Sequence, residues 1–368
     1  MTTAPMLDRD AERRDTLVGR LFESAIGTLD VFSIYIGDRL GLYRALADLG
    51  CTTAEELASA TGTHERYVRE WLEQQAATGI LDVTHGGSVG SARCYSLPAG
   101  HEETLLHGAS LNYMAAMLRL VVGATRPLPA LLRAFREGGG VPYADYGLDT
   151  IEGIAEMNRP MFLNQLGNEW LPAVPDIHAR LQDSIVPARV ADVGCGTGWS
   201  SIAIARAYPH AEVHGFDVDE TSIALAKANA VAAGVADRVT FAVRDAAHPG
   251  LAGGYDLVTA FETVHDMARP VEALRKMRAL MREGGAVIIA DERVGEEFSA
   301  PGDDIERLNY GFSVLHCLAV GMADEPSAGT GTIMRPPTLR AYAAEAGFRD
   351  VEILPIDNTF WRFYRLVA

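Results

Sequence analysis

The sequence has few cysteines, few basic residues and no long apolar run, and each shortage excludes a class of protein. Among 368 residues there are four cysteines, with no CxxC pair and no cysteine–histidine spacing typical of zinc ligands. We therefore expect four reduced thiols and a cytoplasmic protein. No segment reaches the roughly 18 consecutive apolar residues of a membrane-spanning helix. The first ten residues are polar and acidic, and they lack the basic-then-apolar order of a secretory signal.

The charge balance argues against a general nucleic-acid or membrane-surface binder. Lysine and arginine together number 32 against 49 acidic residues, so the formal net charge is −17. Binding to phosphates requires an excess of basic side chains. We therefore expect a small-molecule ligand, with no nucleic-acid or membrane partner.

The N-terminal third is predicted to be helical and to end in a winged helix. Apolar residues at helical spacing between residues 10 and 48, interrupted only by Gly27 and Gly41, predict two or three helices. Thr53 and Glu56 fit a capping box at the start of a further helix. After the next helix, residues 80–83 and 93–97 read as a hairpin. We assign residues 1–104 to a mostly helical, winged-helix-like domain with a role in dimerisation.

A winged helix also raises the alternative of DNA binding, in a cofactor-responsive transcription regulator. Residues 51–83 hold six acidic side chains and two basic ones, namely Glu55, Glu56, Glu65, Glu70, Glu73 and Asp82 against Arg66 and Arg69. Docking such a helix in a DNA groove would bring carboxylates close to phosphates. We therefore regard this function as the alternative.

Residues 105–180 read as a helical connecting segment that covers the substrate. Asn164 and Trp170 lie just before the next domain, so we predict that they contact the substrate. Residues 181–368 then alternate strand and helix, which is typical of an α/β domain with a parallel sheet. The predicted strands are Arg189–Val193, Glu212–Phe216, Val239–Val243, Leu257–Phe261, Ala286–Ala290 and a final antiparallel hairpin of residues 351–356 and 360–367.

A long insertion follows the fifth of these strands. Residues 296–336 are rich in Gly, Ser, Pro and Asp and include an apolar, helix-like piece, residues 308–322. An insertion beside the carboxyl edge of a sheet is a candidate active-site lid. His316 lies in it, and we include it among the substrate residues and as an alternative base.

A glycine-rich turn after the first strand of this domain predicts a ligand site. Gly194, Gly196 and Gly198 follow a buried strand and precede a helix, so the backbone can approach a ligand closely beside the free N–H groups of the helix. Asp217 ends the next strand, where an acid can bind ribose hydroxyls. A dinucleotide site would need a third glycine at position 199, but Trp199 stands there.

The spacing Asp192-x-Gly194-x-Gly196-x-Gly198 instead resembles the first motif of class I S-adenosylmethionine-dependent methyltransferases. The likeness continues through residues 215–217, 244–246 and 283–289 and covers about half of the chain. It implies a seven-stranded Rossmann-like sheet that binds S-adenosylmethionine and releases S-adenosylhomocysteine. It implies that Asp192 and the turn of Gly194, Cys195, Gly196 and Gly198 bind the methionine part. Asp217 would then bind the ribose hydroxyls, and Asp245 with Ala246 the adenine. The further cofactor-binding residues are Val218, Phe261 and Glu262.

The segment Glu262-Thr263-Val264-His265-Asp266-Met267 is similar to one in plant-type and bacterial natural-product O-methyltransferases. In those enzymes a His-Asp-Trp triplet opens a helix, and the histidine is the general base; here Met267 replaces the tryptophan. The resemblance implies O-methylation of a hydroxyl or phenol with His265 as the base, in a homodimer formed through the N-terminal domain. A non-methylating reaction on the same fold is a further alternative.

No metal site is expected. Asp291 and Glu292 follow the fifth strand without a compact set of further ligands. We interpret them as solvated or helix-capping acids.

Overall fold

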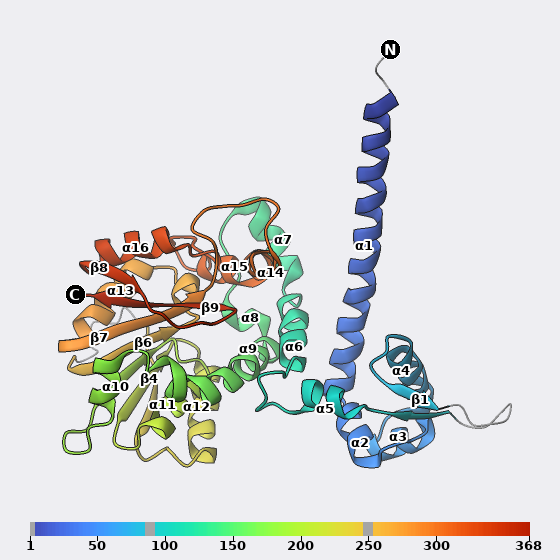
Figure 1. Ribbon diagram of the computed structural model, residues 1–368, viewed down its shortest axis with the longest axis horizontal. Coiled ribbons are helices and arrows are strands. Elements are labelled where there is room, and N and C mark those ends of the chain that lie inside the picture. Colours follow the sequence, from blue (N-terminus) through green and yellow to red (C-terminus); the bar gives the residue numbers. More distant parts are fainter. Residues whose placement is uncertain (1–3, 85–92, 246–252) are drawn as a thin grey trace. The chain divides into compact units, whose positions relative to one another are not determined.

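The computed structural model describes residues 4–84, 93–245 and 253–368. The chain divides into two compact units, Met1–Val122 and Gly123–Ala368. The division falls inside the segment 105–180 that we predicted to connect the domains. Each unit is described below by itself (Figure 1).

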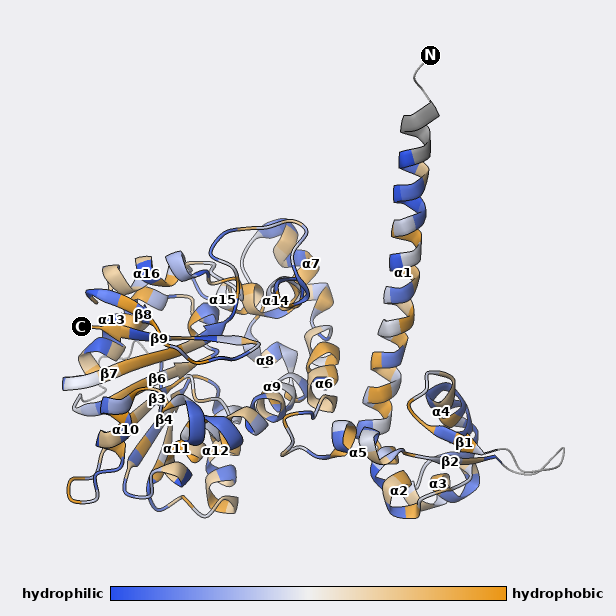
Figure 2. Ribbon diagram, in the orientation of Figure 1, coloured by the Kyte–Doolittle hydropathy of each residue, from blue (hydrophilic) through white to orange (hydrophobic). Residues whose placement is uncertain are grey.

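The first unit begins with one long helix. α1 runs over Ala4–Arg39 without interruption, so Gly27 does not break it, whereas Gly41 adopts a left-handed conformation ahead of α2. The remaining elements are α2 (Leu42–Leu49), α3 (Ala54–Thr61), α4 (Glu65–Ala77), β1 (Asp82–Thr84), β2 (Cys94–Ser96), α5 (Ala99–Leu106) and the start of α6 (Ala115–Ala124). Thr53 and Glu56 form the predicted capping box of α3. Apolar residues recur along α1, as the hydropathy colouring of the ribbon shows (Figure 2).

The winged-helix core is built from α2, α3, α4 and the hairpin. Leu46, Leu57 and Leu72 are fully buried in it. Trp71 packs against Tyr43 at a ring-centroid distance of 5.1 Å and donates from Nε1 to the carbonyl of Ser33 on α1. This bond anchors α1 to the helical core.

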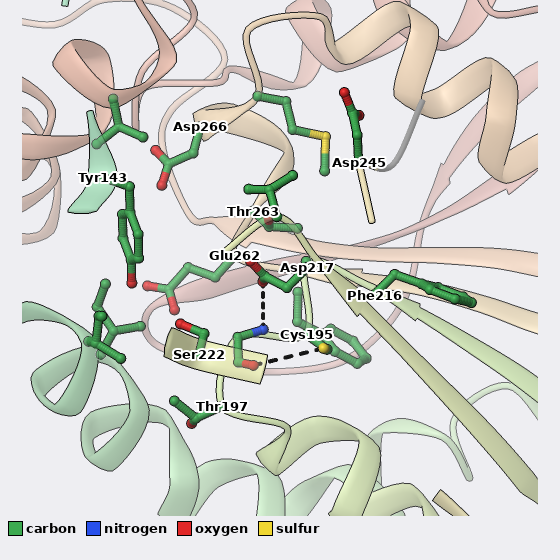
Figure 3. A pocket seen from close by; sticks show the side chains of 18 of the residues that line it. Tyr143, Cys195, Thr197, Phe216, Asp217, Ser222, Asp245, Glu262, Thr263 and Asp266 are labelled. Carbon is green, nitrogen blue, oxygen red and sulfur yellow. Dashed lines mark hydrogen bonds between the residues drawn. The ribbon is translucent and has the colours of Figure 1, made fainter. Parts of the chain in front are cut away.

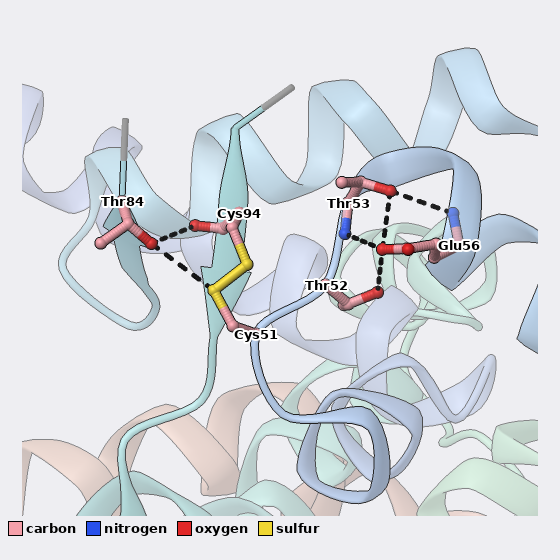
Figure 4. The surroundings of a disulfide bond; sticks show 6 residues. All are labelled: Cys51, Thr52, Thr53, Glu56, Thr84 and Cys94. Atoms are coloured by element: carbon pink, nitrogen blue, oxygen red, sulfur yellow. Dashed lines mark hydrogen bonds between the residues drawn. A yellow bond between two sulfur atoms is a disulfide. The ribbon is translucent and has the colours of Figure 1, made fainter. Parts of the chain in front are cut away.

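A disulfide joins Cys51 to Cys94, which corrects the expectation of four reduced thiols (Figure 4). Thr52 and Tyr95 form an isolated β-bridge with backbone hydrogen bonds of 2.9 and 2.8 Å. Each is preceded by one of the two cysteines, whose Cα atoms therefore lie 5.5 Å apart. The two residues are 43 positions apart, so their spacing gave no sign of the contact. The other two cysteines are free and buried.

The second unit contains the predicted seven-stranded sheet, in the order β5-β4-β3-β6-β7-β9-β8. The strands are β3 (Arg189–Val193), β4 (Glu212–Asp217), β5 (Val239–Val243), β6 (Tyr255–Phe261), β7 (Met281–Glu292), β8 (Asp350–Ile353) and β9 (Trp361–Val367). All neighbours pair in parallel except β9, which is antiparallel to β7 and β8. The direction of winding reverses between β3 and β6, and in open α/β sheets such a point is where ligands bind.

Helices cover both faces of this sheet and bury two separate apolar clusters. Alternate strand residues point to opposite faces, so Val190 and Ile288 join one cluster, whereas Ala191 and Val287 join the other. The helices on the first face include α10 (Pro175–Leu181), α11 (Trp199–Ala207) and α12 (Glu220–Ala232); those on the second are α13 (Pro270–Leu280) and α16 (Pro336–Glu345).

The remaining helices come from the connecting segment and the insertion. They are α7 (Leu128–Glu137), α8 (Tyr143–Tyr146), α9 (Leu148–Met161), the π-helical η1 (Phe162–Trp170), α14 (Asp304–Phe312), the π-helical η3 (Ser313–Cys317) and α15 (Leu318–Gly321). The segment before α8 packs closely on α15, where the N–H of Val141 donates to the carbonyl of Ala319 at 2.8 Å. A Cβ on Gly140 would lie 2.1 Å from the same carbonyl oxygen, so only glycine fits there.

Within the described ranges, no single helix is long and apolar enough to cross a membrane. The bent pair α6 and α7 passes that test only when the two helices are taken together, by length and composition.

The buried carboxylate of Asp256 gives a test of this fold. It accepts hydrogen bonds from Nε of Arg180 at 2.7 Å and from the backbone N–H of Arg189 at 2.8 Å, and it forms an ion pair with Arg282 at 2.6 Å. Asp256 is 3% exposed. We expect Asp256→Ala to lower the free energy of unfolding by roughly 3 kcal/mol, because three donors lose their shared acceptor. Urea titration measures this. Glu352→Ala on an exposed position of β8 should change it by under about 0.5 kcal/mol, and equal effects would contradict the assigned role.

Candidate active site

A cavity of about 420 Å³ opens at the carboxyl ends of β3, β4 and β6. Figure 3 shows Tyr143, Asp217, Glu262 and Asp266 converging on this space from different elements. Eight of the predicted cofactor residues line it, namely Gly194, Cys195, Gly196, Asp217, Val218, Asp245, Phe261 and Glu262. The structure thus brings together residues up to 68 positions apart at one edge of the sheet.

The glycine turn adopts the backbone conformation that the sequence predicts. Gly194, Gly196 and Gly198 have φ of 68°, 51° and 84°, in the left-handed region that favours glycine. A Cβ on Gly194 would lie 2.2 Å from Oγ1 of Thr263, and one on Gly198 would contact Phe241 at 2.6 Å. Gly198 is therefore required for packing, and it does not line the cavity.

Asp217 closes the cavity at the end of β4. Its carboxylate accepts from the N–H of Gly196 at 2.8 Å and from the N–H of Asp219 at 3.0 Å. Burial raises its pKa despite these bonds. Asp245 lies at the same edge and pairs with Arg269 at 3.1 Å. Ala246, which we also predicted to bind the cofactor, lies outside the described residues.

Asp192 lies behind the turn and does not reach the cavity. Its buried carboxylate accepts from Ser200 and Ser201, both at 2.6 Å, and from Thr259 at 2.8 Å. These partners belong to α11 and β6, so Asp192 holds the helix and two strands together beneath the turn. Burial raises its pKa against the opposing effect of these bonds.

The three predicted substrate residues do not line the cavity. Asn164 in η1 donates to the carbonyl of Pro160, near the end of α9, at 2.8 Å. Trp170 is buried among aromatic rings, 4.8 Å from that of Phe363. His316 is buried against the ring of Tyr146 at 4.5 Å. Their polarity or size suggested a ligand, but each is used in packing.

His265 lies beside the cavity in a short 3-10 turn, η2 (Val264–Asp266), and not at the start of a helix. It is buried, with Nδ1 2.8 Å from Asp291 and Nε2 3.2 Å from Asp266. Burial alone would lower the pKa of His265, but these two carboxylates outweigh it and hold the pKa well above its usual value. Asp266 lies between His265 and the open space, since it lines the cavity and His265 does not.

Asp291 and Glu292 are buried within β7, which corrects their interpretation as solvated or capping acids. Burial raises the pKa of both Glu292 and Glu262, and the nearby carboxylate of Glu262 raises the pKa of Glu292 further. β7 continues two residues beyond the predicted strand because β9 pairs with it up to Glu292. That pairing is a tertiary contact, which strand periodicity does not reveal.

Sequence reasoning missed several residues of the cavity wall. Asn158 on α9 lines it and donates from Nδ2 to Glu262, and Tyr143 lines it from α8. Val320, Ala323 and Asp324 come from the insertion, which therefore forms part of the cavity wall. Asn158 and Tyr143 belong to a helical segment with no motif around them, so no local signal marked them.

His265, Asp266 and Cys317 place potential metal-ligand atoms within 4.8 Å of one another. Both ring nitrogens of His265 are already within ion-pair distance of carboxylates. Two members of this trio, His265 and Asp266, therefore already belong to an ion-pair cluster with Asp291.

Family models match both units. Residues 187–318 match the methyltransferase domain family, and residues 29–107 match the Rv2258c-like winged HTH domain. The first match includes the glycine turn, Asp217, Glu262 and His265. The second covers most of the helical core of the first unit.

Curated relatives agree with these matches. The chain is 29% identical over 284 residues to acetylserotonin O-methyltransferase of Mus musculus molossinus, covering 74% of this chain and 72% of that protein. It is 32% identical over 128 residues to ubiquinone biosynthesis O-methyltransferase of Bordetella avium (strain 197N), covering 35% of this chain and 49% of that relative.

Solved structures share the fold over nearly the whole chain. Mitomycin 7-O-methyltransferase MmcR has a TM-score of 0.68 at 20% identity, covering 97% of this chain and 99% of that one. Human N-acetylserotonin methyltransferase, solved in complex with S-adenosylmethionine, has a TM-score of 0.66 at 18% identity, covering 96% and 97%. At these identities the likeness establishes the fold alone.

The glycine turn gives a prediction with a matched control. Gly194→Ala adds a Cβ to a left-handed residue and drives it into Thr263, whereas Gly284→Ala adds one at φ 75° with no atom within 4 Å. Both changes cost about 1–2 kcal/mol of backbone strain, and we expect Gly194→Ala to cost roughly 2 kcal/mol more. Denaturant unfolding compares the two variants. Equal losses would show that contact with Thr263 does not constrain the turn.

Proposed function

Because the chain belongs to the S-adenosylmethionine-dependent methyltransferases and has an N-terminal winged-helix domain, we propose that it methylates an oxygen atom of a small molecule. The observation that supports this proposal most strongly is the cavity. The glycine turn, Asp217 and Asp266 line it, and Asp266 pairs with His265. Its volume of about 420 Å³ falls within the range of small-molecule sites.

The residues of the cavity fit this cofactor, which supplies an activated methyl group when bound. We propose that the turn Gly194–Gly196 receives its methionine part, since Gly194 and Gly196 have no side chain that would keep a ligand from their backbone. Asp217 would accept the ribose hydroxyls, because a carboxylate has free acceptor positions beyond its two backbone bonds. The lining also has more acids than bases, which suits a cationic sulfonium; the acids are Asp217, Asp245, Glu262, Asp266 and Asp324 against Arg244 and Arg269.

We propose that His265 accepts the proton of the acceptor hydroxyl. Asp291 fixes the ring through Nδ1, which leaves Nε2 on the side of Asp266 and the cavity. Turning the Asp266 side chain away would open Nε2 to the acceptor. It would also remove one of the two charges that raise the pKa of His265, and so favour the neutral, proton-accepting form.

We expect His265→Gln to keep affinity for S-adenosylhomocysteine and to lower kcat by about 10²–10⁴-fold. Methyl transfer from labelled cofactor to a panel of phenols, followed by mass spectrometry, measures turnover and separates methylation from a non-methylating reaction. Because a base must be deprotonated and the pKa of His265 is raised, the wild-type rate should increase with pH above about 6.5. In Asp266→Asn this rise should move to lower pH. Normal turnover in His265→Gln would eliminate this residue as the base.

We further propose a homodimer formed through α1. This helix carries large side chains that are 39–67% exposed, namely Leu17, Val18, Leu21, Phe22, Ile26, Leu29, Phe32 and Ile36. At 1.5 Å per residue its 36 residues extend for about 54 Å. An exposed apolar stripe of this length is typical of an interaction surface.

The double variant Phe22→Asp/Leu29→Asp places two charges on that stripe. We expect it to sediment as a monomer where the wild-type chain is a dimer, since burying a carboxylate without a partner is unfavourable. Thr16→Asp adds a charge at an exposed position on the other side of the same helix and serves as the control. An unchanged dimer in the double variant would exclude this interface.

The alternative of a DNA-binding regulator gains no support from the charges of α4. Its two arginines are paired along the helix, Arg69 with Glu65 and Arg66 with Glu70, both at 2.6 Å. Neither is a free cation for a phosphate.

A cytoplasmic location also stays a proposal, and the Cys51–Cys94 disulfide does not favour it, since such bonds are typical of oxidising compartments.

A further inference from the structure

His265, Asp266 and Cys317 form a trio of metal-ligating side chains where η2 meets the insertion. Each offers one ligand atom, and these atoms lie within 4.8 Å of one another. His265 is 2% exposed and Cys317 is 8% exposed, so solvent does not separate them. The cysteine lies far from the other two residues in the sequence, which is why no ligand spacing predicted a metal site.

Backbone contacts hold the insertion against η2 and so fix the position of the trio. Cys317 ends η3, directly before α15. In α15, a Cβ on Gly321 would lie 3.3 Å from the carbonyl oxygen of Asp266. Further along the insertion, the N–H of Ala328 donates to the carbonyl of Ala268 at 2.8 Å. The thiol is therefore presented to His265 by packed backbone, which a preorganised site requires.

The spacing between His265 and Asp266 is suited to two ligands of one ion. Nε2 of His265 lies 3.2 Å from Oδ1 of Asp266. This buried oxygen nevertheless makes no hydrogen bond to any residue in the described part of the chain. A tetrahedral zinc ion with Zn–N and Zn–O bonds of about 2.0–2.2 Å separates two such ligand atoms by about 3.4 Å. The observed spacing is close to that value.

Two further side chains orient the imidazole and the thiol. Nδ1 of His265 lies 2.8 Å from Asp291, which leaves Nε2 as the ligand atom. Metal-binding histidines are typically fixed by a carboxylate in this way. Nδ1 of His316 lies 3.4 Å from the sulfur of Cys317, so a proton on that nitrogen would stabilise a thiolate. Each of the two stronger ligands thus has an outer partner.

The ligand atoms favour a soft divalent cation. Imidazole and thiolate suit Zn²⁺, whereas Mg²⁺ and Ca²⁺ prefer oxygen ligands. A thiolate, a carboxylate and a neutral imidazole together carry two negative charges, which neutralise the ion and so reduce the cost of burying it. Binding releases the thiol proton of Cys317 to solvent, together with the proton of His265 where the ring is charged.

We propose that His265, Asp266 and Cys317 form an inhibitory binding site for Zn²⁺. Asp266 lines the cavity, which gives the ion a path to the trio. The ion would occupy Nε2 of His265, the atom to which we assigned proton acceptance. The inhibition therefore rests on the proposed function, whereas binding of the ion does not.

Calorimetry of the full-length chain with Zn²⁺, in competition with a chelator, measures the binding. A non-reducing buffer keeps Cys51 and Cys94 joined. We expect one ion to bind with a Kd below about 1 μM. Cys317→Ser should weaken binding by more than about 100-fold, and Asp291→Asn, which removes an outer partner, by about 10- to 100-fold. Cys195→Ser removes the other free, buried thiol and is the matched control, with wild-type affinity for the ion.

Two further readouts report on the same atoms. With Co²⁺ in place of Zn²⁺, wild type should show the absorption band of a cobalt–thiolate bond, and Cys317→Ser should lose it. In the methyl-transfer assay, Zn²⁺ should inhibit wild type at the concentrations at which it binds, and a chelator should restore turnover. Cys317→Ser should keep its turnover at those concentrations. Thermal unfolding of each variant checks that it is folded.

The outcomes separate this site from the proposed function. Equal Zn²⁺ affinity in wild type and Cys317→Ser, or equally tight binding of Mg²⁺, would overturn the metal site. Normal turnover by zinc-loaded wild type would overturn the inhibition. Failure of the ion-free wild type to methylate any acceptor, with Zn²⁺ still bound through Cys317, would contradict the proposed function alone.

Discussion

The site depends on one buried carboxylate that is not part of the cavity. Asp192 accepts bonds from two serines of α11 and from Thr259 of β6, all between 2.6 and 2.8 Å. It thereby fixes the end of β3 relative to the next strand and to the helix that follows the turn. A glycine turn can hold an open, left-handed backbone only if its two ends are fixed in this way. The glycines give the turn its freedom of conformation, and Asp192 removes that freedom again.

Buried acids are also concentrated beside the cavity at the ends of β6 and β7. His265, Asp291 and Asp266 form one ion-pair cluster, and burial raises the pKa of Glu262 and of Glu292. Such a group of acids is costly to bury, and its stability depends on the protonation of its members. The protonation of these residues and any charge that enters the cavity are therefore electrostatically coupled.

The first unit contributes in a different way. Its core packs around Leu46, Leu57 and Leu72, and α1 is anchored to it through Trp71. Beyond that anchor the helix carries more apolar surface than the unit itself can bury. A long helix gains most of its stability from packing. The exposed apolar residues of α1 therefore require a further surface to pack against.

The local patterns of the sequence determined most of the second unit. The alternation of buried strands and helices predicted the strands of the sheet, and the spacing of Gly194, Gly196 and Gly198 predicted the left-handed turn, because both are properties of short segments. Tertiary structure alone decided what each acid does. Asp192 links β3 to α11 and β6 beneath the turn. Glu292 lies near Glu262, because pairing of β7 with β6 and β9 brings distant residues together. Asn158 and the Cys51–Cys94 bond were hidden for the same reason, since contacts between distant segments leave no periodicity in the sequence.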